Sequence, residues 1–103
     1  MTVNVVAVIT AKEGQQDAVL AAMKEAAPHY HADPGCLLFA LHRSGRSKIV
    51  VVESYADKEA LQRHAESDVF KALGAKTKDL VEGPSEITLC TPEPCGDEKK
   101  GAL

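Results

Sequence analysis

The segment Ile49–Phe70, IVVVESYADKEALQRHAESDVF, organises the rest of the chain. Its first part, as far as Tyr55, is rich in β-branched residues and is typical of a buried strand. Asp57 is a good N-cap, and the apolar residues after it recur at helical spacing, which places His64 on the apolar side. The stretch therefore predicts a buried strand, a sharp turn and an amphipathic helix, with a second helix starting at Ser67–Asp68.

The rest of the chain can be placed in order around this unit. The predicted elements are a strand at 3–11, a helix at 15–30, strands at 37–43 and 48–55 joined by a hairpin loop, two helices between 57 and 80, and a strand at 86–91. Alternation in the second strand puts Leu37, Phe39 and Leu41 on one face. Pro28 lies inside the first helix, where a missing backbone donor should kink or loosen the last turn.

The order β-α-β-β-α-α-β predicts an α+β, ferredoxin-like antiparallel sheet with its helices on one face. A chain of 103 residues fits one domain, which we place at residues 1–91. The polar segment 92–103, with its prolines and glycines, is expected to be flexible or draped on a partner.

The two inner strands of this sheet are apolar on both faces, although the helices can cover only one. An uncovered sheet of valine and isoleucine would be a large apolar patch. The simplest cover is the same sheet from a second copy of the chain, which makes a dimeric α+β barrel. The sequence therefore predicts a homodimer formed through the sheet face.

Composition narrows the class of partner. Lys plus Arg number 12 and Asp plus Glu 15, so a net charge of -3 gives no reason to expect nucleic acid or an anionic membrane as partner. No apolar run approaches the roughly 20 residues that span a bilayer, and no signal-peptide pattern opens the sequence, so we expect a cytoplasmic protein. The three cysteines are odd in number and widely spaced, and no metal site is predicted from them.

Several short motifs occur in a characteristic order along the chain. They are Gly14 before the first helix, Pro34-Gly35-Cys36 entering the second strand, Glu53-Ser54-Tyr55 closing the third, and Ala60-Leu61-x-x-His64-x-x-Ser67 with Phe70. In these motifs the chain resembles the antibiotic biosynthesis monooxygenase family of small dimeric ferredoxin-like proteins, over roughly residues 3–91. That family includes quinol and anthrone monooxygenases, haem-degrading enzymes and a signal-molecule isomerase, so the resemblance implies a fold and leaves the reaction open.

One branch of the family can be compared residue by residue. The segment from Ser67 to Ala72 is similar to a run in the haem-degrading members. Those members also have an axial histidine, a first-strand asparagine and a tryptophan at the positions that here hold Gly74, Ala7 and Tyr55. Haem degradation is therefore disfavoured, because iron without its proximal imidazole would bind weakly.

The remaining enzymatic interpretation is oxygenation without a cofactor. The sequence contains neither GxGxxG nor HxxxH, so no nucleotide, flavin or metal site is predicted. Such chemistry requires a substrate that supplies the electrons, such as a phenol or quinol whose anion reacts with O2. The protein must then take the proton, stabilise the anion and exclude water.

The expected site lies between the sheet and the helices. His64 is the candidate base, and Tyr55 could hydrogen-bond a phenolate oxygen. The predicted substrate-binding residues are Asn4, Phe39, His42 and Phe70. Glu53 could be a second base or could pair with Arg43, Arg46 or Lys48 across the hairpin. The alternatives are an isomerase of the same fold and a non-catalytic dimer that binds a small molecule.

Overall fold

The computed structural model describes residues 1–103 and has the predicted order of elements. The elements are β1 (Val3–Thr10), α1 (Gln16–His31), β2 (Cys36–Ser44), β3 (Lys48–Tyr55), α2 (Lys58–Glu66), α3 (Asp68–Thr77), the 3-10 helix η1 (Lys78–Leu80) and β4 (Glu86–Cys90). The last predicted helix thus ends three residues early, and its final turn tightens into η1. None of the helices has the length and apolar character needed to cross a bilayer.

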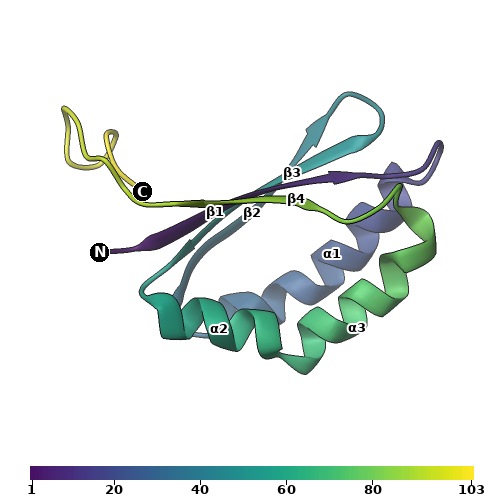
Figure 1. Cartoon of the computed structure of the whole chain (residues 1–103), viewed down its shortest axis with the longest axis horizontal. Coiled ribbons are helices and arrows are strands. Elements are labelled where there is room, and N and C mark those ends of the chain that lie inside the picture. The colour runs from purple at the N-terminus through teal and green to yellow at the C-terminus, as the bar shows by residue number, and fades with distance from the viewer.

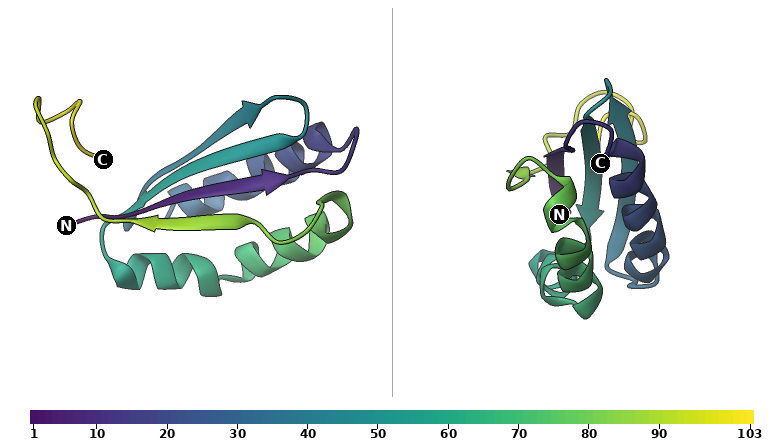
Figure 2. Two further views of the ribbon diagram at one scale, coloured as in Figure 1. Left: turned by 45° about the horizontal axis from the view of Figure 1, so that its top comes forward. Right: turned by 90° about the vertical axis from the view of Figure 1, so that its right-hand side faces the viewer.

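The four strands form one antiparallel sheet in the order β2-β3-β1-β4. All three α-helices lie under one face of it, as Figure 1 shows with the sheet seen edge-on. The two views in Figure 2 show the same two layers, with α1 beside the α2–α3 pair. The predicted α+β, ferredoxin-like fold is therefore confirmed.

The core forms where the inner face of the sheet meets α1. Period-two alternation turns Ala7, Ile49 and Val51 toward the helices. Helical spacing turns Val19 and Met23 back toward them, and all five are buried. This packing fixes which residues of β1 and β3 face the helix side and therefore which can line a site there.

One local prediction needed correction. The prediction that Leu37 shares a face with Phe39 and Leu41 is wrong, because a β-bulge lies between Cys36 and Leu38 and leaves Leu37 54% exposed. Helix α1 continues through Pro28 to His31, and the N–H of Ala32 donates to the Pro28 carbonyl oxygen at 3.1 Å. The proline costs one hydrogen bond in the last turn without ending the helix.

The opposite, outer face of the sheet carries no helix. Its central residues are Val6, Val8, Val50 and Val52 from β1 and β3, all half-buried. The C-terminal segment turns back toward the start of β1, as Figure 1 shows. There the carbonyl oxygen of Leu103 accepts hydrogen bonds from Thr2 Oγ1 at 2.8 Å and Asn4 Nδ2 at 3.1 Å.

Candidate functional site

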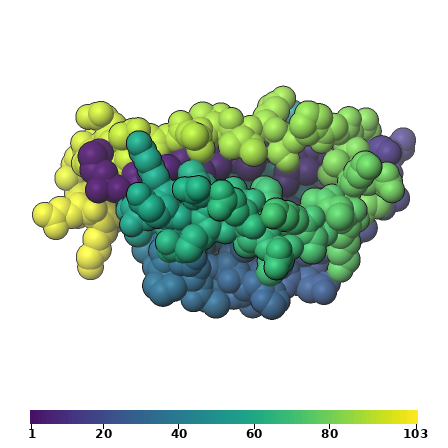
Figure 3. All heavy atoms as spheres, turned by 60° about the horizontal axis from the view of Figure 1, so that its bottom comes forward, coloured from purple at the N-terminus to yellow at the C-terminus, as the bar shows by residue number.

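A cavity of about 160 Å³ lies between the inner face of the sheet and the helices. Phe70 of α3 and Ile87 of β4 line it and are 40% and 60% exposed, so they mark its mouth. Figure 3 shows this side of the molecule, with β4 running alongside α2 and α3 and atoms of β1 visible between them. The walls are mostly apolar and include Ala7, Ile9, Val19, Met23, Phe39, Val51, Leu73 and Val81.

Three polar side chains from three different elements meet in this apolar wall. They are Tyr30 of α1, Glu53 of β3 and His64 of α2. His64 Nε2 lies 3.5 Å from Glu53 Oε1, and the rings of His64 and Tyr30 have centroids 4.3 Å apart. Only Thr77 and Ser85 add further polar side chains to the lining. The cavity therefore has an apolar wall in which one group of side chains can transfer protons.

Glu53 is buried at the end of β3, with 6% of its surface exposed. Tyr55 lies two residues on and so on the same face, and its hydroxyl donates to Glu53 Oε1 at 2.5 Å. Burial raises the pKa of the Glu53 carboxyl, because the charged form loses its hydration, and the Tyr55 hydrogen bond opposes that shift. No lysine or arginine pairs with Glu53, so the predicted alternative of a cross-hairpin ion pair is not formed.

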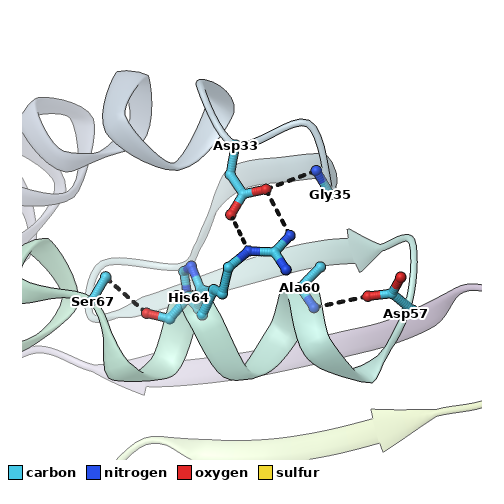
Figure 4. A network of polar contacts seen from close by, with 7 residues as sticks. Asp33, Gly35, Asp57, Ala60, His64 and Ser67 are labelled. Atoms are coloured by element: carbon cyan, nitrogen blue, oxygen red, sulfur yellow. Dashed lines mark hydrogen bonds and ion pairs between the residues drawn. The ribbon is translucent and has the colours of Figure 1, made fainter.

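His64 is presented by a firmly capped α2. Asp57 Oδ1 accepts from the Ala60 N–H at 2.8 Å at the start of the helix, and Ser67 Oγ donates to the His64 carbonyl oxygen at 2.8 Å at its end. Figure 4 shows both contacts on either side of His64. The imidazole lies among the rings of Tyr30, Phe39, Tyr55 and Phe70, with centroids 4.3 to 5.9 Å away.

Burial among these rings lowers the pKa of His64 to about 4. The imidazole is therefore neutral at pH 7, and its 3.5 Å approach to Glu53 is a polar contact there and not an ion pair. Its Nδ1 is buried and has no hydrogen-bond partner. The Tyr30 hydroxyl is likewise buried without a partner, and burial raises its pKa to about 12.

A second, smaller cavity of about 70 Å³ lies on another side of His64. Tyr30 and His64 border both cavities, whereas Asp33 and Arg63 border only the second. Arg63 Nε donates to Asp33 Oδ2 at 3.0 Å. Hydrogen bonding by Arg63 holds the pKa of Asp33 down to about 2. Because this ion pair is at the molecular surface, the second cavity leads from His64 toward solvent.

The structure brings some of the predicted site residues together and separates others. His64, Phe39 and Phe70 line the large cavity, and Tyr55 reaches it through Glu53. Asn4 and His42 do not line it, because alternation turns both to the outer face. There Asn4 is paired with Ser54 and His42 with Val50. Binding of substrate by these two residues would require a second site on that face and stays a prediction.

Sequence reasoning missed Tyr30 and gave Glu53 only a secondary role. Tyr30 falls on the apolar face of α1, and a phenol predicted to be buried there was the available signal. Glu53 is a carboxylate that follows an apolar strand on its inward face, which was also visible. Both roles depend on side chains from other elements, and spacing within one element does not reveal such contacts.

The positions compared with the haem-degrading branch also lie here. Ala7 and Gly74 both line the large cavity, so this chain has neither the first-strand amide nor the axial imidazole of that branch there. No group of three His, Cys, Asp or Glu side chains converges anywhere in the chain.

Solved structures share this fold. A Mycobacterium tuberculosis protein superposes with a TM-score of 0.85 at 22% identity and covers 94% of this chain and 100% of its own. A Caulobacter crescentus protein, described as a candidate antibiotic biosynthesis monooxygenase, superposes with a TM-score of 0.82 at 29% identity and covers 86% and 87%. A Pseudomonas aeruginosa protein superposes with a TM-score of 0.79 at 23% identity and covers 86% of this chain and 91% of its own.

No curated protein matches the sequence. The family description for antibiotic biosynthesis monooxygenase matches residues 2–76, which include β1, β2, β3, α2 and both members of the Glu53–His64 contact. With that match over most of its length, and with the fold and cavity described above, the chain belongs to the antibiotic biosynthesis monooxygenase family.

Proposed function

We propose that this protein is a monooxygenase that oxidises a small, electron-rich aromatic of quinol or anthrone type with O2, without metal or flavin. The family match supports monooxygenase activity at the level of the family. The observation that carries the finer proposal is the cavity itself. It is apolar enough to hold an aromatic ring, and its polar groups gather around Glu53 and His64, where a substrate proton can be removed.

The reaction balances without an external reductant. For an anthrone-type substrate, a CH2 carbon becomes C=O, one oxygen atom of O2 is kept and the other leaves as water. The substrate supplies all four electrons. The protein's part is to remove a proton so that the electron pair becomes available to O2, and to exclude water from the anion. His64 and Tyr55 belong to this proton-handling group, and Phe39 and Phe70 hold the ring.

The working form is proposed to be a homodimer. The outer face of the sheet is apolar and uncovered within one chain, as the half-buried Val6 and Val52 illustrate. A second sheet packed on this face would take these valines out of water, which is the reason for proposing a dimer.

Oxygen uptake by the metal-stripped protein, with a panel of quinols and anthrones, tests the function. The matched variant is Gly74→Leu. Gly74 lines the cavity, and a Cβ there would meet nothing within 4 Å, so a larger side chain can enter the cavity without backbone strain. The control is Ala75→Leu, which places the same leucine side chain on the exposed side of α3.

We expect uptake above autoxidation in the wild type and in Ala75→Leu, and a loss of at least tenfold in Gly74→Leu. Uptake that Gly74→Leu leaves unchanged would place the reaction outside this cavity. No uptake with any substrate would reject the oxygenase, and the panel would then be used for ligand binding and for isomerisation of carbonyl compounds.

A further inference from the structure

We propose that Glu53 is the catalytic residue that takes the substrate proton, and that His64 passes this proton on to the second cavity. This inference rests on the proposed function and assigns the roles within its site. It replaces a single histidine base by an ordered pair, in which the carboxylate acts first.

The two oxygens of Glu53 have different surroundings. Oε1 accepts the Tyr55 hydroxyl and faces His64 Nε2, so within the protein it already has partners while Glu53 is ionised. Oε2 accepts no hydrogen bond from the chain. It is also not fully enclosed by protein atoms. Since Glu53 lines the large cavity, Oε2 is the oxygen available to a substrate hydroxyl there.

The surroundings of Glu53 favour its protonation. The titratable groups that face it are Tyr55 of the same strand, Tyr30 of α1 and His64 of α2, all neutral at pH 7, and Cys36 of β2 lies near Tyr55. No cation compensates the buried carboxylate charge. Taking a proton therefore removes an isolated charge from an apolar site, and burial accordingly raises the pKa of Glu53 toward the range of an effective base.

His64 is placed to act second. Its Nε2 faces Glu53, and its Nδ1 has no partner in the chain. The imidazole borders both cavities, and the second has a volume of about 70 Å³. About 10–15 Å³ of such a volume is enough for one water, so the second cavity can hold water. His64 Nδ1 and Tyr30 Oη lie enclosed in its wall, and a small movement of the imidazole would bring Nδ1 to that water.

The proposed step conserves protons and electrons. The substrate O–H or C–H bond breaks, its electron pair stays on the substrate as the anion, and the proton forms a bond to Glu53 Oε2. Rotation of the neutral carboxyl group then brings its O–H to His64 Nε2, which accepts the proton while Nδ1 releases its own proton to water in the second cavity. O2 afterwards accepts electrons from the substrate anion, as in the proposed function.

The first variant to test is Glu53→Gln, with Glu13→Gln as control. Gln keeps the shape of Glu53 and can still accept from Tyr55, but it cannot take a proton. Glu13 is exposed in the turn before α1, so its replacement removes the same charge far from the site. We expect kcat/KM for oxygen uptake to fall about 100- to 10,000-fold in Glu53→Gln and to stay unchanged in Glu13→Gln.

A second readout does not need turnover. Binding of a non-oxidisable phenol should produce the infrared carbonyl band of a protonated carboxylic acid in the wild type and in His64→Gln, but not in Glu53→Gln. In His64→Gln we also expect kcat to fall more than kcat/KM, because release of the proton becomes slow. Tyr55→Phe removes a hydrogen bond that lowers the pKa of Glu53, so the acid limb of the rate profile should move to higher pH.

The two proposals fail separately. Wild-type oxygen uptake that persists in Glu53→Gln would overturn the role of Glu53 and leave the oxygenase standing. An infrared band on phenol binding without any oxygen uptake would overturn the oxygenase and keep Glu53 as the proton acceptor. Absence of both signals would overturn both proposals, and absence of the band in His64→Gln alone would make His64 the first acceptor.

Discussion

At the scale of single residues, the proton affinity of His64 depends strongly on the fold. Burial lowers the pKa of its imidazole from 6.5 to about 4, so the unfolded chain binds this proton more readily than the folded protein. The free energy of unfolding therefore falls as the pH drops from 6.5 through about 4, by up to about 3 kcal/mol. We expect His64→Gln to remove this part of the pH dependence in urea unfolding between about pH 7 and pH 4.5.

The carboxylates of Glu53 and Asp33 also make the free energy of unfolding depend on pH. Glu53 acts in the opposite direction to His64, and Asp33 acts only at lower pH. Burial raises the pKa of Glu53, so its contribution to the free energy of unfolding increases as the pH falls, and His64→Gln retains that contribution. Asp33, with a pKa of about 2, loses its stabilising charge only below 3.8, outside the measured range. His29→Gln, at an exposed position of α1, is the control. Equal pH slopes for the wild type and His64→Gln would contradict the expected shift.

At the scale of elements, the contact between α2 and the start of β2 places His64 over the sheet. Gly35 is buried there, and its carbonyl oxygen accepts from the Ala56 N–H at 2.8 Å. A Cβ on Gly35 would lie 2.5 Å from Ala60 Cβ and 2.8 Å from Arg63 Nη2. We expect Gly35→Ala to push α2 away and to reduce the free energy of unfolding by about 1–3 kcal/mol in urea titrations.

Gly83→Ala is the matched control for this clash, since a Cβ there would meet nothing within 4 Å. The double variant Gly35→Ala/Ala60→Gly removes the nearest clashing atom. Its loss of stability should be smaller than the sum of the two single losses, because the residues touch. A strictly additive double variant would show that the Gly35–Ala60 contact does not position α2.

The same elements show how far sequence reasoning could reach. Periods of 2 and 3.6 residues gave the order of the elements and placed His64, Phe39 and Phe70 inward, since each pattern fixes a face within its own element. The side of the sheet on which Asn4 lies was not predictable, because β1 is apolar on both faces. The Glu53–Tyr55–His64 contacts bring together β3 and α2, and such long-range placement depends on the packing of the whole sheet.

At the scale of the whole molecule, the two faces of the sheet differ in what covers them. Helices cover the inner face, whereas no helix lies over the outer face. Val6, Val50 and Val52 are half-buried there. The C-terminal segment is hydrogen-bonded to the start of β1, at Thr2 and Asn4. A second copy packed on the outer face would bury its valines, and the inner cavities would remain open beside α3.

Val52 is the position at which this assembly is most directly tested. It lies on β3 between Val6 of β1 and Ala40 of β2, at the centre of the outer face. A lysine there is solvated in a single chain but would be buried without a partner in the dimer, at a cost of several kcal/mol. We expect sedimentation velocity to show a dimer for the wild type and for the exposed control Ala75→Lys, and a monomer for Val52→Lys. A monomeric wild type would reject the dimer, and a dimeric Val52→Lys would move the interface off this face.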